Sequence, residues 1–128
     1  MAKNIFGVVA GLAVWMVVAT VADRIMRASW PAYASVASSM TFTLPMMIGR
    51  LAIGALATIA MGMVTAVIAR SVIARLMPGV LMLVIFVPGH VMIWEKFPVW
   101  YHLAFLLSLL PLTYVGARLA GWDRSMGQ

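Results

Sequence analysis

The sequence predicts an all-α integral membrane protein, a four-helix bundle, from its composition and from the spacing of its charges. Of its 128 residues, 65% are hydrophobic and only 9% are charged, and the mean hydropathy is +1.07. The charges lie between four long apolar runs, at about residues 5–22, 48–69, 76–94 and 98–117. Each run has close to the roughly 20 residues that an α-helix needs to span a bilayer. The runs are continuously apolar rather than alternating, which favours helices over a closed barrel.

The same composition narrows the classes of function. Four spans occupy most of residues 1–128, so we expect a single transmembrane domain without a separate soluble one. The formal charge of +6 comes from nine Lys and Arg residues scattered in ones and twos. Without a clustered basic patch, these charges indicate membrane topology and contact with anionic lipid headgroups, not nucleic-acid binding. The chain has no cysteine, which excludes disulfides, thiol nucleophiles and Cys–metal sites.

The first run is interpreted as a retained spanning helix. With Lys3 before it and small residues after it, it also resembles a secretory signal peptide. However, it is long enough to span, and Gly7 and Gly11 are spaced as in a helix that packs closely against another. We expect this helix to end near Asp23 and Arg27, an acid and a base four residues apart that form an ion pair at the helix terminus.

Residues 28–47 form the only long connection, and a weak helical pattern lies within it. Apolar residues recur there at three- and four-residue steps: Trp30, Tyr33, Ala37, Met40 and Leu44. Pro31 suits the first turn of such a helix. We therefore predict a short interfacial helix between spans 1 and 2. It lacks the cationic face of a membrane-surface helix, so it is interpreted as a lid over the mouth of the bundle.

The second span has the clearest packing pattern in the chain. Four small or hydroxyl residues follow one another at four-residue steps, namely Gly54, Thr58, Gly62 and Ala66. Small residues on one face let two helix backbones approach closely, so this row predicts a helix–helix contact. The third span begins, on this interpretation, around Pro78 and has almost no small residues in its middle. We expect it to be the helix most exposed to lipid.

One polar cluster stands out, at the tip of the hairpin formed by spans 3 and 4. His90 and His102 each lie about four residues from the short turn at 95–98, which places both at the same depth, with Glu95 close by. Two imidazoles and a carboxylate could ligate a metal or haem iron, or transfer protons. The spacing matches no ligand motif, however. The favoured interpretation is therefore a pair of solvent-wetted residues in the interfacial aromatic belt, and we expect no cofactor.

The orientation follows from the Lys and Arg count. With the N-terminus inside, five basic residues are cytoplasmic: Lys3, Arg70, Arg75, Arg118 and Arg124. Four are outside: Arg24, Arg27, Arg50 and Lys96. The positive-inside rule then slightly favours cytoplasmic N- and C-termini. The chain looks like small multi-pass proteins of the bacterial inner membrane, which is where we expect it.

No catalytic motif is present, so the favoured interpretation is a non-enzymatic membrane protein with a structural or partner-binding role. We expect it to contact lipid and to form a homo-oligomer or join a membrane-protein partner. The alternative is a small homodimeric transporter or channel subunit. In size and near-balanced charge the chain is similar to the small multidrug resistance transporters, which carry a Glu in the first span. Here residues 5–22 contain no acid. A haem- or metal-binding subunit is the third interpretation.

Overall fold

The computed structural model describes residues 2–121, and this part of the chain is helical without any strand. Its elements are α1 (Ala2–Ser29), α2 (Pro31–Val36), α3 (Leu44–Ile68), α4 (Val72–Met92), the short 3₁₀ helix η1 (Trp94–Lys96) and α5 (Val99–Leu119). Four of them, α1, α3, α4 and α5, are long and apolar enough to cross a membrane. The predicted all-α bundle and its multi-pass character are thereby confirmed.

Two of the predicted helix starts were wrong, whereas α1 ends at Ser29, close to Arg27 as expected. Helix α3 already starts at Leu44. Helix α4 begins at Val72, because the Ser71 side chain caps its first turn by accepting a hydrogen bond from the Ala74 amide. Pro78 is therefore inside α4, not at its start. In each case the helix extends beyond the apolar run. Hydropathy indicates which residues lie in lipid, and a helix can continue past them into a more polar segment.

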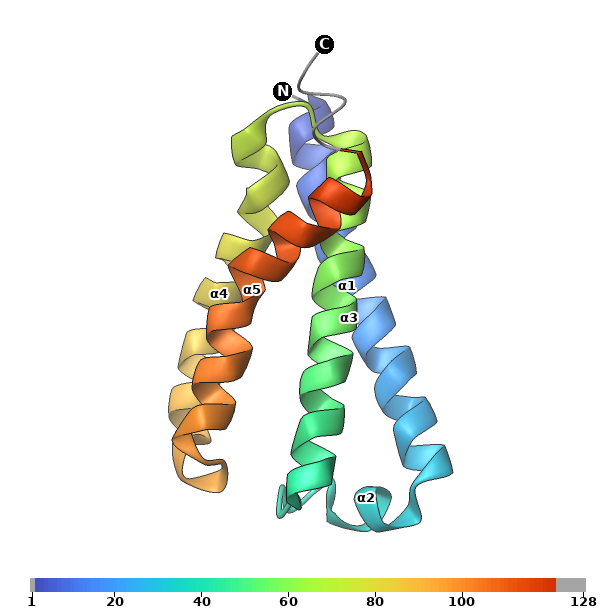
Figure 1. The fold of residues 1–128 in the computed structure, drawn as a ribbon, viewed down its shortest axis with the longest axis vertical. Helices are drawn as coiled ribbons and strands as arrows, with labels where there is room; N and C mark the ends of the chain where they lie inside the picture. Colours follow the sequence, from blue (N-terminus) through green and yellow to red (C-terminus); the bar gives the residue numbers. More distant parts are fainter. Residues whose placement is uncertain (1, 122–128) are drawn as a thin grey trace.

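Helix α3 packs against α1 on one side and α5 on the other, and α4 packs mainly against α5. The start of α1 and the end of α5 lie at one end of the bundle (Figure 1), while α2 and the α4–α5 turn lie at the other. The short helix predicted between the first two spans is present, although it covers only Pro31–Val36. We call the end that carries α2 the hairpin end.

Small residues allow the close helix contacts. The six residues identified as a packing set are all buried: Gly7, Gly11, Gly54, Thr58, Gly62 and Ala66. A Cβ added at Gly62 would collide with the backbone carbonyl of Thr113 in α5, and one at Gly11 would collide with the Thr65 hydroxyl in α3. Thr58 accepts a hydrogen bond from the indole of Trp15 in α1 (3.0 Å). This row therefore faces protein on both sides of α3.

The expectation that the third span is the most lipid-exposed was wrong. In α1 only 11% of the most apolar window is buried within the protein, against 28% in α4. The apolar middle of α4 packs on α1 and α5 through large side chains, including Met82 and Phe86. An absence of small residues excludes close backbone approach, but it does not exclude side-chain packing.

The start of α1 is tied to the α3–α4 connection by Asn4. Its side-chain oxygen accepts hydrogen bonds from the backbone amides of Arg70 (2.7 Å) and Ser71 (3.3 Å). Buried Arg75 donates from Nε to the carbonyl of Ala69 (3.0 Å), just after the end of α3. The end of the bundle opposite the hairpin end is thus closed by polar contacts to backbone groups.

Candidate anion-binding cleft

A cleft of about 750 Å³ opens between the spans near the hairpin end. This volume lies in the range of small-molecule sites, about 300–1,000 Å³. All four long helices and the α1–α3 connection contribute to its lining. The lining divides into a polar part around Asp23, Arg50 and His90 and an apolar part around Trp15, Phe86 and Phe105.

The polar part has an excess of positive charge. Arg24, Arg27 and Arg50 line the cleft together with a single carboxylate, Asp23. Asp23 forms an ion pair with Arg27 (2.8 Å), as the sequence predicted for these two residues, and Arg27 lies in the last turn of α1. Among the described residues, Arg24 makes no hydrogen bond or ion pair. The charges around the cleft therefore leave about two guanidinium groups without a carboxylate.

Arg50 joins three helices at the cleft. It sits in α3 roughly 9 Å from the helix start, six residues at about 1.5 Å each. Its Nη1 donates to the Tyr33 hydroxyl (2.9 Å) and its Nε to the Tyr101 hydroxyl (3.1 Å). The guanidinium also lies 4.8 Å from the centre of the Phe42 ring. These bonds use two of its five N–H groups, and the Arg50 side chain lines the cleft.

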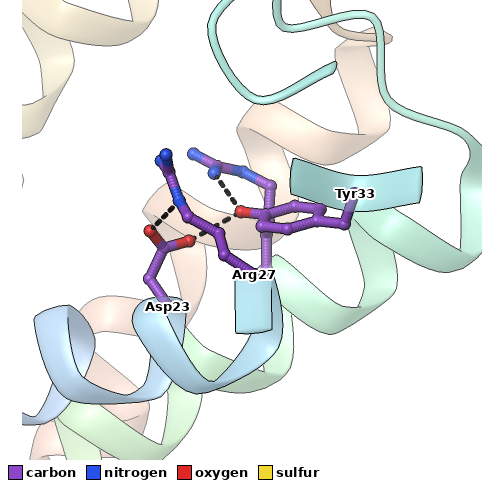
Figure 2. A network of polar contacts seen from close by, with 4 residues as sticks. Asp23, Arg27 and Tyr33 are labelled. Atoms are coloured by element: carbon purple, nitrogen blue, oxygen red, sulfur yellow. Dashed lines mark hydrogen bonds and ion pairs between the residues drawn. The ribbon is translucent and has the colours of Figure 1, made fainter. Parts of the chain in front are cut away.

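Tyr33 connects the acidic and basic sides of the network, as Figure 2 shows. Its hydroxyl donates to Asp23 (2.7 Å) while it accepts from Arg50. The Tyr33 side chain is completely buried. Burial, followed by the hydrogen bond to Asp23, raises the pKa of Tyr33 above its ordinary value. The hydroxyl accordingly stays protonated at neutral pH and can act as the donor to Asp23.

His90 and His102 are in direct contact across the α4–α5 hairpin. Their Nδ1 atoms are 2.7 Å apart, and Nε2 of His102 lies 3.0 Å from the backbone carbonyl oxygen of Trp94. The Trp94 ring stacks on His102 with centroids 4.4 Å apart. His90 also lines the cleft, and its ring stacks on that of Tyr101 at 6.2 Å. The pair is thereby connected to the Arg50 network.

Two sequence expectations for this pair need correction. Solvent-wetted histidines were expected, but His90 is only 6% exposed and His102 is fully buried. The reason is that α4 and α5 pack together up to their turn and place Trp94, Phe97 and Tyr101 around the rings. Glu95 is exposed on η1, and no hydrogen bond or ion pair within residues 2–121 joins it to either histidine.

The arrangement also bears on metal binding. Both Nδ1 atoms are used in the contact between the two rings, and no group of three or more His, Cys, Asp or Glu side chains in the described chain is placed to hold a metal ion. Such a set is what a protein-bound transition metal usually requires.

The sequence did not identify Arg50, Tyr33 or Tyr101 as site residues. Arg50 was counted as a topological charge, Tyr33 was placed in the short interfacial helix, and Tyr101 was assigned to the aromatic belt around the hairpin. A signal was nevertheless present, because Arg50 lies inside the predicted run at 48–69, and an arginine within a spanning helix needs a polar partner within the protein. Its partners are 17 and 51 residues away along the chain. Helical spacing in the sequence relates residues only a few positions apart, so it could not identify them.

No protein-family model, curated protein or solved structure matches this chain. The functional argument therefore rests on the cleft itself.

Proposed function

We propose that this protein is a non-enzymatic membrane protein that binds the headgroup of an anionic lipid in the cleft between its helices. The observation that supports this is the composition of the cleft wall, with three arginines against one carboxylate in the polar part and aromatic side chains beside them. Guanidinium groups match the geometry of phosphate oxygens and are weakly hydrated, so they bind phosphate well at low dielectric.

The apolar part of the lining supports a lipid as the source of the anion. Trp15, Phe86 and Phe105 adjoin the arginines, and Trp15 and Phe86 pack on each other with ring centroids 5.2 Å apart. Acyl chains can lie along such a surface while the phosphate meets the arginines. A free inorganic anion would use only the polar part.

The predicted orientation determines the membrane leaflet to which the cleft opens. The slight excess of Lys and Arg at the end that carries the termini supports a proposal of cytoplasmic termini in a bacterial inner membrane. The cleft, at the hairpin end, then opens to lipids of the outer leaflet. The hypothesis of a structural or partner-binding subunit, which forms a homo-oligomer or joins a membrane partner, stays a prediction. It is compatible with a lipid that is bound between the subunits.

Thermal unfolding of the purified protein in detergent tests this function. Phosphatidylglycerol added at about 100 times its dissociation constant should stabilise the folded state by about 2.7 kcal/mol. Zwitterionic phosphatidylcholine should stabilise it much less, because its headgroup carries no net negative charge. Inorganic phosphate alone should have little effect, because it lacks the acyl chains.

Arg24→Gln and Arg70→Gln form the matched pair of variants. Each removes one exposed positive charge. Arg24 lines the cleft, whereas Arg70 follows the end of α3 that lies away from the hairpin end. We expect Arg24→Gln to weaken phosphatidylglycerol binding several-fold and Arg70→Gln to leave it unchanged. Equal effects of the two changes would indicate general attraction of lipid to a basic protein. Stabilisation by phosphate as large as that by phosphatidylglycerol would overturn the lipid assignment.

A further inference from the structure

The hydrogen bonds of the histidine pair determine where its protons lie. Nε2 of His102 faces a backbone carbonyl oxygen, which can only accept, so this nitrogen carries a proton. In neutral His102, Nδ1 is then an acceptor. The contact between the two Nδ1 atoms requires one donor, so Nδ1 of neutral His90 carries the other proton. The neutral pair therefore has one bare nitrogen, Nε2 of His90.

A third proton has one place to go. Nδ1 and Nε2 of His102 and Nδ1 of His90 are already engaged in hydrogen bonds, so the added proton occupies Nε2 of His90. His90 lines the cleft, and within the described chain no hydrogen bond to its Nε2 is formed. Protonation thus changes this nitrogen from an acceptor to a donor and adds a positive charge beside the arginines.

Asp23 is the one acid among the described residues that line the cleft with His90, and it is already bonded. From α1, the cleft receives Asp23, Arg24 and Arg27, and Asp23 is already bonded to Arg27 and Tyr33. From α3 it receives Arg50, and from α5 Tyr101 and His102 contact the His90 ring. Tyr33 of the connection reaches it through Arg50, and α4 supplies no other charge there. Glu95 and Lys96 of η1 are exposed.

We propose that the His90–His102 pair is the proton-binding site of the cleft, so that the anionic headgroup and one proton bind cooperatively. This inference rests on the proposed function. In an empty cleft, protonated His90 would lie among arginines whose one carboxylate, Asp23, is already paired with Arg27. A bound phosphate supplies a further negative charge and accepts a hydrogen bond from Nε2. By linkage, the proton raises lipid affinity by the same factor as the lipid raises proton affinity.

The test is the affinity of the intact protein in detergent for phosphatidylglycerol at about pH 5.5 and about pH 8, on either side of the ordinary imidazole pKa of about 6.5. The phosphodiester keeps its single negative charge over this range. We expect binding about tenfold tighter at the lower pH, within the usual range of coupling between sites, about 5- to 150-fold. Binding at the lower pH should also take up protons from a weakly buffered solution.

His90→Gln separates the two proposals. Whatever its affinity at about pH 8, the variant should bind phosphatidylglycerol no tighter at about pH 5.5 than at about pH 8, and it should take up no protons. If the parent binds equally at both pH values without proton uptake, the proton site is disproved and the lipid site stands. If the parent binds at neither, the proposed function itself is wrong.

Discussion

At the scale of single residues, the main feature is how a cation is held inside a spanning helix. Arg50 is only partly exposed and is bonded to two tyrosine hydroxyls, one of which passes the interaction on to Asp23. Neutral hydroxyls orient the guanidinium without cancelling its charge, which a directly bonded carboxylate would do. Its positive charge is therefore available to the cleft.

Tyr33→Phe tests this network. The change removes the donor to Asp23 and one acceptor of Arg50, while Asp23 keeps Arg27 and Arg50 keeps Tyr101. Since hydrogen bonds to charged groups contribute about 1.5–3 kcal/mol, we expect unfolding in detergent to become easier by about 2 kcal/mol. Tyr114→Phe, which removes an exposed hydroxyl bonded to Arg118, is the control and should cost clearly less.

The stability difference between the parent and Tyr33→Phe should depend on pH in one direction only. Because the folded protein holds the Tyr33 proton more tightly than the unfolded chain, the stabilisation is complete below the ordinary tyrosine pKa of about 10 and falls as pH rises through the raised pKa. The stability difference between the parent and Tyr33→Phe should thus be constant from about pH 6 to 9 and shrink above it. A difference that disappears on acidification within that range would contradict the assigned donor.

At the scale of elements, the four helices were predictable and their partners were not. Long apolar runs identify spans because only helices satisfy the backbone in lipid. The Asp23–Ser29 end of α1 is less apolar, yet it is helical and contacts Tyr33 through Asp23, a tertiary contact that hydropathy does not report. The depth of the two histidines followed from the short turn. Their burial depended on rings brought in by Trp94 and Tyr101, which are tertiary contacts.

Gly62→Leu tests the contact between α3 and α5. A side chain there would meet the backbone of Thr113, which cannot move without displacing α5. We expect the free energy of unfolding in detergent to fall by about 3 kcal/mol or more, the upper range for overpacking. Val84→Leu, on an exposed face of α4, should change it by no more than about 0.5 kcal/mol. Equal tolerance of both changes would show that α3 and α5 do not pack through Gly62.

At the scale of the whole molecule, the even number of spans and the charge count predict that both ends of the chain face the cytoplasm. A reporter active only in the cytoplasm should therefore work when fused after Gln128, and a reporter active only in the periplasm should be silent there. The opposite result would reverse the orientation and place the cleft at the inner leaflet. Activity of both reporters would indicate dual insertion.

The Asn4 contact has a consequence for biosynthesis. Its two amide donors lie 66 and 67 residues further along the chain. Helix α1 is therefore synthesised well before the two amides that bind Asn4, and until then it is a separate span. This suits a helix that buries so little of its surface against protein, because most of its apolar surface can contact lipid. The bundle can close at that end only after Ser71 has been synthesised, so the start of α1 is fixed together with the end of α3 and not when α1 itself is made.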